Sequence, residues 1–240
     1  RVAQIKITAK RPVALAHGRG YFNEKTAEIY TDFSLFTCHQ NICEEVRNVF
    51  NFIEYSFKHY DFKYLQVSPF NNRRKIRALI NREIHAAKSG RKAIISLKLN
   101  NLVDDSIIRQ LYAASQAGVK IRMIVRGMCS LKPGIEGVSD NISIISIVDR
   151  FLEHPRCLVF HNGGDPEVYL SSADWMTRNL DYRLEVGVPI LDAKLKKRVI
   201  DILEIQFSDR RKARVIDEQQ SNKKKVRSQM AVYDYLKKLK

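Results

Sequence analysis

The chain has 240 residues and is 45% hydrophobic, so it is long enough to bury a core and too apolar to be intrinsically disordered. Its 42 lysines and arginines exceed its 26 acidic residues, and the formal charge of +16 favours a polyanionic partner: nucleic acid, an anionic membrane, a nucleotide or a phosphate polymer. The four cysteines show neither CxxC nor zinc-type spacing, and no apolar run reaches the roughly 20 residues of a membrane span, so we expect reduced thiols in a cytosolic protein.

The chain begins with two predicted strands. Residues 2–8 follow a period of two and residues 13–16 form a short apolar run, and Gly18 and Gly20 permit a tight turn after the second strand. No turn or cap precedes the first strand. We therefore expect the chain to begin inside a domain.

A helix and a linker follow this turn. Apolar residues at helical spacing predict a helix over residues 43–57. Residues 58–63 are polar and aromatic without a clear period, and we interpret them as a linker between two units. This divides the chain into the C-terminal part of a truncated first domain, at residues 1–60, and a second domain at residues 61–240.

Strands and helices alternate in the first half of the second unit. They are a strand at 65–70, a helix at 71–90, a strand at 93–99, a helix at 105–118 and a strand at 119–125. Asp104 or Asp105 is the expected N-cap of the second helix. Strand, helix and strand in this order form a βαβ unit, which predicts an α/β fold with a parallel or mixed sheet flanked by helices.

Four more strands are expected after this unit, at residues 142–148, 156–160, 167–170 and 184–188. A long helix over residues 191–207 follows, and the chain ends in a helix at residues 230–240. The tail from Arg210 onward is rich in lysine and arginine, a composition more typical of a solvated face than of a binding site.

Arg126 follows directly on the predicted strand at residues 119–125. Ligands of α/β sheets bind in the crevice beyond the carboxyl ends of the strands. Arg126 is therefore a candidate for a contact with phosphate.

The stretch from residue 151 to residue 185 carries the most chemistry. His154 lies two residues from Arg156, and two apolar runs on either side of a turn at Asn162 predict a hairpin. A histidine in a cationic pocket can act as a nucleophile, a general acid or a hydrogen-bond donor to a phosphoryl oxygen. An arginine beside it binds phosphate oxygens bidentately. Together these residues indicate phosphoryl transfer.

The end of this stretch resembles a segment near the beginning of the chain, which indicates an internal repeat. Residues 18–32 align without a gap on residues 171–185, and each copy follows a short apolar run. The aligned pairs include Lys25 with Arg178, Tyr30 with Arg183, and Asp32 with Glu185. A duplicated strand, turn and polar segment is the simplest interpretation.

The sequence resembles the motifs of two known protein groups. The spacing from Ser171 to Glu185 resembles the second half-motif of the phospholipase D superfamily. The segments NEKTAEIYTDFSLFT, NLVDDSIIRQLYAASQAGVKI, IVRGMCSLKPGI, RFLEH and NGGDPEVYLSSADWMTRNLD, in this order, resemble the C-terminal half of the bacterial polyphosphate kinases of the first type. That resemblance implies a phospholipase-D-like domain preceded by part of a second one, the two closing around ATP.

The resemblance also implies an activity. In this family the terminal phosphate of ATP is transferred reversibly to an enzyme histidine and then to a growing polyphosphate chain, with Mg²⁺ as cofactor. Carried over by motif, Tyr30 in IYTD, Arg126 in IVRG and His154 in FLEH contact the nucleotide phosphates, and His154 is also a catalytic residue.

Other residues are assigned to the same pocket by the resemblance. Asp32, Arg183 and Glu185 complete the ATP and phosphate site. Arg178 and Lys98 are candidates for the path of the polyphosphate chain. No metal ligand is expected within this chain.

Two departures from the family pattern affect these expectations. The family has Gly-Thr-Gly-Asn where this chain has Gly18, Arg19, Gly20 and Tyr21, so the first turn differs. The phosphorylated histidine of the family lies in an H-x-K element upstream of that turn, and the alignment of the two copies places its counterpart at or before Arg1. We therefore expect the nucleophile and the Mg²⁺ ligands to lie upstream, and the chain alone to be inactive or nearly so.

The expected partners are ATP or ADP and inorganic polyphosphate, with no specific nucleic acid. The resemblance implies a homo-oligomer for the full-length protein and a cytoplasmic location, including peripheral association with the inner face of the membrane.

Two other functions stay open on the residues alone. The first is a phospholipase-D-like phosphodiesterase or nuclease that uses His154, which is disfavoured because Arg156 does not share a proton as readily as the lysine of an H-x-K element. The second is a non-catalytic module that binds polyanions, although no motif specific for RNA or DNA is present.

Overall fold

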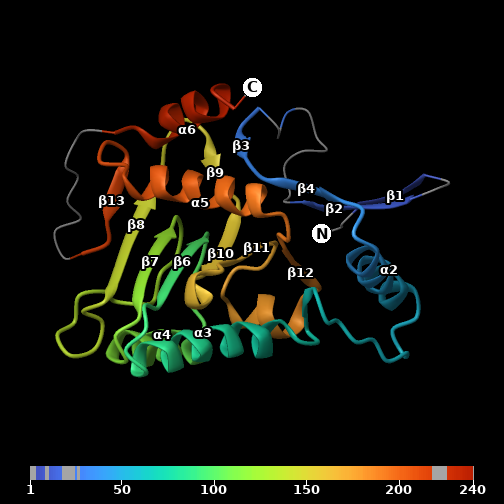
Figure 1. The fold of residues 1–240 in the computed structure, drawn as a ribbon, viewed down its shortest axis with the longest axis horizontal. Helices are drawn as coiled ribbons and strands as arrows, with labels where there is room; N and C mark the ends of the chain where they lie inside the picture. The colour runs from blue at the N-terminus through green and yellow to red at the C-terminus, as the bar shows by residue number, and fades with distance from the viewer. Residues whose placement is uncertain (1–3, 9–10, 18–24, 26–27, 218–225, 240) are drawn as a thin grey trace.

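A computed structural model describes residues 4–8, 11–17, 25, 28–217 and 226–239. The described residues form two main sheets and a short two-stranded pairing between them (Figure 1). The predicted turn at Gly18 and Gly20, with Arg19 and Tyr21, lies outside the described residues.

The smaller sheet belongs to the beginning of the chain. It contains the antiparallel strands β1 (Gln4–Thr8), β2 (Arg11–His17) and β4 (Ser34–Thr37) in the order β1-β2-β4. Helix α2 (Gln40–Glu54) follows and buries Ile42, Val46 and Val49. This helix begins and ends three residues earlier than its apolar pattern predicts.

The larger sheet has eight strands in the order β13-β8-β7-β6-β10-β11-β12-β5. Their bounds are β5 (Gln66–Ser68), β6 (Ile94–Leu99), β7 (Lys120–Val125), β8 (Ile142–Ile147), β10 (Arg156–Phe160), β11 (Glu167–Ser171), β12 (Glu185–Pro189) and β13 (Ala213–Val215). Strands β6, β7 and β8 are parallel, and the other neighbours pair antiparallel. The expected α/β class with a mixed sheet flanked by helices is confirmed.

Helices cover both faces of the large sheet. Helices α3 (Asn72–Lys88) and α4 (Asp105–Gln116) lie on one face, and α5 (Ala193–Phe207) lies on the other, next to α6 (Ser228–Lys237) (Figure 1). None of the helices that the structure describes is long and apolar enough to cross a membrane.

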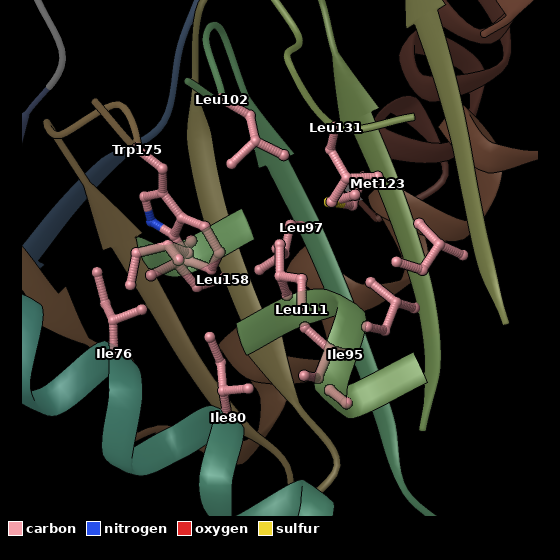
Figure 2. Close-up of a cluster of buried hydrophobic side chains, with 14 of the residues drawn as sticks. Ile76, Ile80, Ile95, Leu97, Leu102, Leu111, Met123, Leu131, Leu158 and Trp175 are labelled. Atoms are coloured by element: carbon pink, nitrogen blue, oxygen red, sulfur yellow. The ribbon is translucent and has the colours of Figure 1, made fainter. Parts of the chain in front are cut away.

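One apolar core fills the space between the sheet and the pair α3 and α4. Figure 2 shows Ile76 and Ile80 of α3 and Leu111 of α4 meeting Leu97 and Leu158 of the sheet. All five side chains are essentially fully buried. Each such burial contributes on the order of 1.5–3 kcal/mol, which holds the helices against the strands of the large sheet.

Several short elements were not predicted. They are β3 (Tyr30–Thr31), β4, β9 (Leu152–Glu153), β13 and a π-helix at Arg178–Tyr182. Strands of two to four residues are too short to show a period, and their pairing partners are distant in the chain. The pairing of β3 with β9 places residues from the beginning of the chain beside His154.

A partly buried ion cluster fastens α3 to the start of α4. The Arg73 guanidinium donates to Asp104 at 2.7 and 2.8 Å and to Asp181 at 2.6 and 2.7 Å. Asp104 is also the N-cap of α4, as expected, and accepts from the Ile107 N–H at 3.1 Å and from the Thr177 hydroxyl at 2.8 Å. Burial alone would raise the pKa of Asp104, but the hydrogen bonds from Arg73, Thr177 and Ile107 outweigh it and lower the pKa to about 2.

We expect Arg73→Gln to lower the free energy of unfolding at pH 7 by about 2 kcal/mol, because Asp104 would lose its cation. A carboxyl group with a lowered folded pKa stabilises the fold above its unfolded pKa, and this contribution is lost as the pH falls toward 2. The difference between parent and variant should therefore shrink between pH 5 and pH 3 in urea unfolding. Arg77→Gln, at an exposed position of α3, is the control, and an equal effect of both variants would contradict the prediction.

Candidate active site

His154 lies between the end of β9 and the start of β10, and β3 runs beside it. Strands β3 and β9 pair in parallel with Thr31 opposite Glu153, and the His154 N–H donates to the Thr31 carbonyl oxygen at 3.4 Å. The residues on either side of Thr31 are Tyr30 and Asp32. The pairing therefore brings both of these side chains from the first sequence copy to a histidine of the second.

The imidazole of His154 sits between an acid and an aromatic ring. Its Nδ1 atom lies 3.6 Å from Oδ1 of Asp32, and the two side chains are 11% and 1% exposed. The Tyr30 ring meets the imidazole edge-on, with 5.1 Å between the ring centroids. A carboxylate beside Nδ1 favours the proton on that nitrogen, so Nε2 is the atom left to face a ligand.

Arg156 is fixed on the Nε2 side of this histidine. Its Nη1 atom lies 3.4 Å from Nε2 of His154 and donates to the His154 carbonyl oxygen at 3.2 Å. Its other nitrogens, Nε and Nη2, donate to the two carboxylate oxygens of buried Asp174, each at 3.0 Å. The guanidinium is therefore held rigidly beside the imidazole.

Asp174 joins Arg156 to the end of β6. Its carboxylate also accepts from the N–H groups of Asn100 and Asn101 at 2.9 and 3.1 Å and from the Asn101 side-chain amide at 3.0 Å. Burial alone would raise the pKa of Asp174, but Arg156 and Asn101 outweigh it and hold the pKa below its ordinary value. Asp174 is therefore a charged carboxylate whose two oxygens both accept hydrogen bonds.

Arg126, directly after β7, completes the cationic side of the pocket. Its Nε atom donates to the Asn100 side-chain oxygen at 2.9 Å, and the Asn100 amide nitrogen donates to the His154 carbonyl oxygen at 3.3 Å. Burial lowers the pKa of Arg126, and the charge of nearby Arg156 lowers it further. Two guanidinium groups that repel one another beside a histidine form a pocket suited to binding an anion.

A second buried network holds β9 from behind. The Lys98 ammonium donates to Glu153 at 2.5 Å and to the Gln206 oxygen of α5 at 2.9 Å, and these side chains are almost fully buried. Glu153 also accepts from Gln206 at 3.0 Å and from Gln229 of α6 at 2.9 Å. Since Glu153 precedes His154, this network fixes the strand that presents the histidine.

Lys98 therefore lies in the interior rather than on a surface that a phosphate chain could follow. A lysine that is 2% exposed and hydrogen-bonded to Glu153 and Gln206 presents no ammonium hydrogen to solvent for a polymer. This buried position argues against a place for Lys98 in the polyphosphate path.

The remaining expected residues of the phosphate site are Glu185, Arg178 and Arg183. Glu185 is buried, and its carboxylate accepts from the Ser172 hydroxyl at 2.5 Å and from the Asn179 amide at 2.7 Å. Arg178 and Arg183, at the start and just past the end of the π-helix, are exposed. Neither arginine forms an ion pair within the part of the chain that the structure describes.

The structure thus brings Tyr30, Asp32 and Arg126 together near His154; that they contact the phosphates of a nucleotide stays a prediction. The main residue that sequence reasoning missed is Asn100, which bonds both Arg126 and the His154 backbone. The position of Asn100 in the sequence could have indicated this role. Asn100 follows directly on β6 as Arg126 follows on β7, and the same argument about the carboxyl ends of strands applies to both.

Models of two protein-domain families match the chain. Residues 65–233 match the polyphosphate kinase C-terminal domain 2, and residues 3–59 match the polyphosphate kinase C-terminal domain 1. The first match alone covers well over half of the chain.

Individual relatives agree with the domain matches. The chain is 60% identical to a polyphosphate kinase of Vibrio parahaemolyticus over 94% of the chain and 34% of that protein, and 57% identical to one of Escherichia coli K12 over 95% of the chain and 34% of that protein. It also resembles the crystal structure of the Porphyromonas gingivalis polyphosphate kinase, with a TM-score of 0.89 and 43% identity over 97% of the chain and 37% of that chain. The chain spans about a third of the length of the curated relatives it matches. The chain belongs to the polyphosphate kinase family.

Proposed function

We propose that this chain carries part of the nucleotide and phosphate site of an enzyme that transfers the terminal phosphate of ATP reversibly to polyphosphate. The observation that supports this best is the convergence of Arg126, Arg156 and Asp32 on His154. Charge develops on phosphoryl oxygens during transfer, and fixed cations stabilise it without reorganising.

Each residue has a distinct role in this proposal. Arg126 and Arg156 bind phosphoryl oxygens, and their anchors Asn100 and Asp174 fix them in place. His154 contacts a phosphoryl oxygen through Nε2, and Asp32 orients the imidazole from the Nδ1 side. In this scheme His154 stabilises the transferred group and is not the residue that becomes phosphorylated.

The nucleophile in this proposal is a histidine upstream of the chain. The alignment of the two copies places Asp32 on Glu185, and the structure pairs Asp32 of the first copy with His154 of the second. By the same relation, Glu185 of the second copy would orient a histidine of the first. Ser172 and Asn179 hold the Glu185 carboxylate in one position for this task.

Mg²⁺, which the family implies, does not fit the residues around His154. Hard divalent cations prefer several oxygen ligands, whereas this pocket presents two guanidinium groups. No group of three or more residues suited to holding a metal occurs in the described parts of the chain. We propose that the metal is held by residues upstream.

The proposal extends to organisation and location. We infer a division into two domains near residue 60, a homo-oligomeric full-length protein, and action in the cytoplasm, where ATP is present, with contacts to the inner face of the membrane through the basic surface. Arg183 and Arg178, which are exposed, would contact phosphates or upstream residues in the full-length protein.

Titration calorimetry of the 240-residue chain with ATP tests the proposal. We expect His154→Ala and Arg126→Ala each to weaken ATP binding by about tenfold or more, because each removes a charge-assisted contact with phosphate. His85→Ala and Arg77→Ala, at exposed positions of α3, are matched controls and should change binding less than twofold. Parental ATP affinity in both site variants would contradict the proposal, and polyphosphate synthesis by the chain alone would contradict the upstream nucleophile.

A further inference from the structure

The segment that presents His154 is held at one edge by β3. The N–H groups of Leu152 and His154 donate to carbonyl oxygens of the β3 segment, to Ile29 at 2.8 Å and to Thr31 at 3.4 Å. Successive backbone groups of a strand point to opposite edges. The backbone of Phe151 therefore faces away from β3.

A side chain takes the place of a second neighbouring strand at this opposite edge. The Phe151 N–H donates to Oε1 of Gln229 at 3.1 Å, and Nε2 of Gln229 donates to the Phe151 carbonyl oxygen at 2.9 Å. A carboxamide carries the same donor and acceptor as a peptide group, so the two bonds have the pattern of a β ladder. The same Nε2 atom donates to Oε1 of Glu153 at 2.9 Å.

Gln229 is the second residue of the C-terminal helix α6, and the start of this helix is fixed. Arg227 donates to Asp149, in the loop between β8 and β9, at 2.7 and 2.8 Å. The N–H of buried Ser228 donates to Asp209, just past the end of α5, at 2.7 Å. The residues before Gln229 are thus tied to two other segments, which aims its amide at β9.

Close packing contributes less to the contact between α6 and β9, which lie next to one another (Figure 1). A cavity of about 280 Å³ separates them, with Phe151 and Pro155 on one side and Val232 and Tyr233 of α6 on the other. Apolar contact between helix and strand is therefore incomplete. The hydrogen bonds of Gln229, which also lines the cavity, carry the connection.

We propose that Gln229 is a positioning residue of the nucleotide site. A two-stranded pairing is marginally stable by itself, and Gln229 supplies the second neighbour that keeps residues 151–154 in register with β3. It thereby holds the imidazole of His154 against Asp32 and beside Arg156. The inference rests on the proposed function and makes the C-terminal helix, which composition alone assigns to a solvated tail, part of the site.

The test compares Gln229→Met with the parental chain. Methionine keeps the length of the side chain and removes the amide. We expect the amide hydrogens of Leu152 and His154 to exchange about tenfold faster, because the β3 pairing loses its support, and the imidazole resonances of His154 to shift in NMR spectra. ATP affinity in titration calorimetry should fall about fivefold.

Two control variants separate this role from a general loss of hydrogen bonds. Gln116→Met makes the same substitution on α4, where the amide donates to the Gly137 carbonyl oxygen at 3.0 Å. Tyr235→Phe removes the hydroxyl that ties α6 to Asp201 of α5 at 2.8 Å. Both should leave ATP affinity and the exchange of the two β9 amides within twofold of the parent.

Each outcome decides the matter. Parental exchange and parental His154 resonances in Gln229→Met would overturn the inference, as would equal effects of Gln229→Met and Tyr235→Phe. Faster exchange with parental ATP affinity would show a structural role alone and also overturn it. The exchange and resonance measurements need no ligand: if they change as expected but the parental chain binds no ATP, Gln229 still positions His154 and the proposed function fails.

Discussion

Lys98→Met is expected to lower the free energy of unfolding by about 3–5 kcal/mol, one of the two largest effects in this chain, because it would leave Glu153 charged and buried without its cation. Glu153 is 3% exposed, and its other hydrogen-bond donors, the amides of Gln206 and Gln229 and the Thr31 hydroxyl, are neutral. Methionine replaces the lysine stem at nearly the same volume, so a cavity contributes little to the loss. Urea unfolding at pH 7 measures the change.

The pH dependence distinguishes an unpaired charge from a packing defect. In the parent, burial alone would raise the pKa of Glu153, but the Lys98 ammonium outweighs it and keeps the pKa below its ordinary value. Stability from this pair is therefore present above the unfolded pKa and lost as the pH falls. In Lys98→Met we expect the pKa of Glu153 to rise instead. Protonation then removes the buried charge, and the difference in unfolding free energy between variant and parent shrinks between pH 7 and pH 5.

Two further variants complete this experiment. Glu153→Gln added to Lys98→Met should restore most of the lost stability, since no charge then remains buried. Lys120→Met, at an exposed position of β7, should change stability by less than about 0.5 kcal/mol. If Lys98→Met behaves like Lys120→Met, the buried pair does not stabilise β9.

The second large effect is expected for Asp174→Asn, at about 3 kcal/mol of unfolding free energy, together with a loss of ATP affinity of about tenfold or more. The Asp174 carboxylate is the acceptor in all five of its hydrogen bonds. Arg156 donates two of them, Asn101 two and Asn100 one. Asparagine turns one acceptor oxygen into an NH₂ group, which then faces an N–H donor. It also removes the charge that holds Arg156 beside His154.

Measuring both unfolding free energy and ATP affinity distinguishes a structural role of Asp174 from a role in positioning Arg156 for binding. If Asp174 positions Arg156, ATP binding per folded molecule should fall at a temperature where the variant is still folded, and phosphate affinity should fall with it. Asp165→Asn, at a surface carboxylate that is 84% exposed and 3.4 Å from Lys196, should leave both quantities nearly unchanged. Asp174→Asn with normal ATP affinity would mean that Arg156 needs no anchor.

Much of the fold follows from local sequence pattern. The βαβ unit from β6 to β7, the N-cap at Asp104 and the position of Arg126 all agree with prediction. These features depend on residues close in the chain: apolar spacing defines which face is buried, and a side chain three residues away satisfies a helix N–H. Membership of the polyphosphate kinase family also follows from motifs in the sequence alone.

The composition of the site was decided by tertiary structure. Strands β3 and β9 have two residues each, so no period marks them, yet their pairing places Asp32 beside His154. The sequence shows Lys98 as one cation among many, and only the helices packed over β6 bury it against Glu153. In the same way, the sequence determined that the tail is basic, but the register of β13 on β8 decided that Lys212 and Arg214 face a cavity. Sequence fixes the charge of a side chain, whereas its partner and exposure depend on segments that only folding brings together.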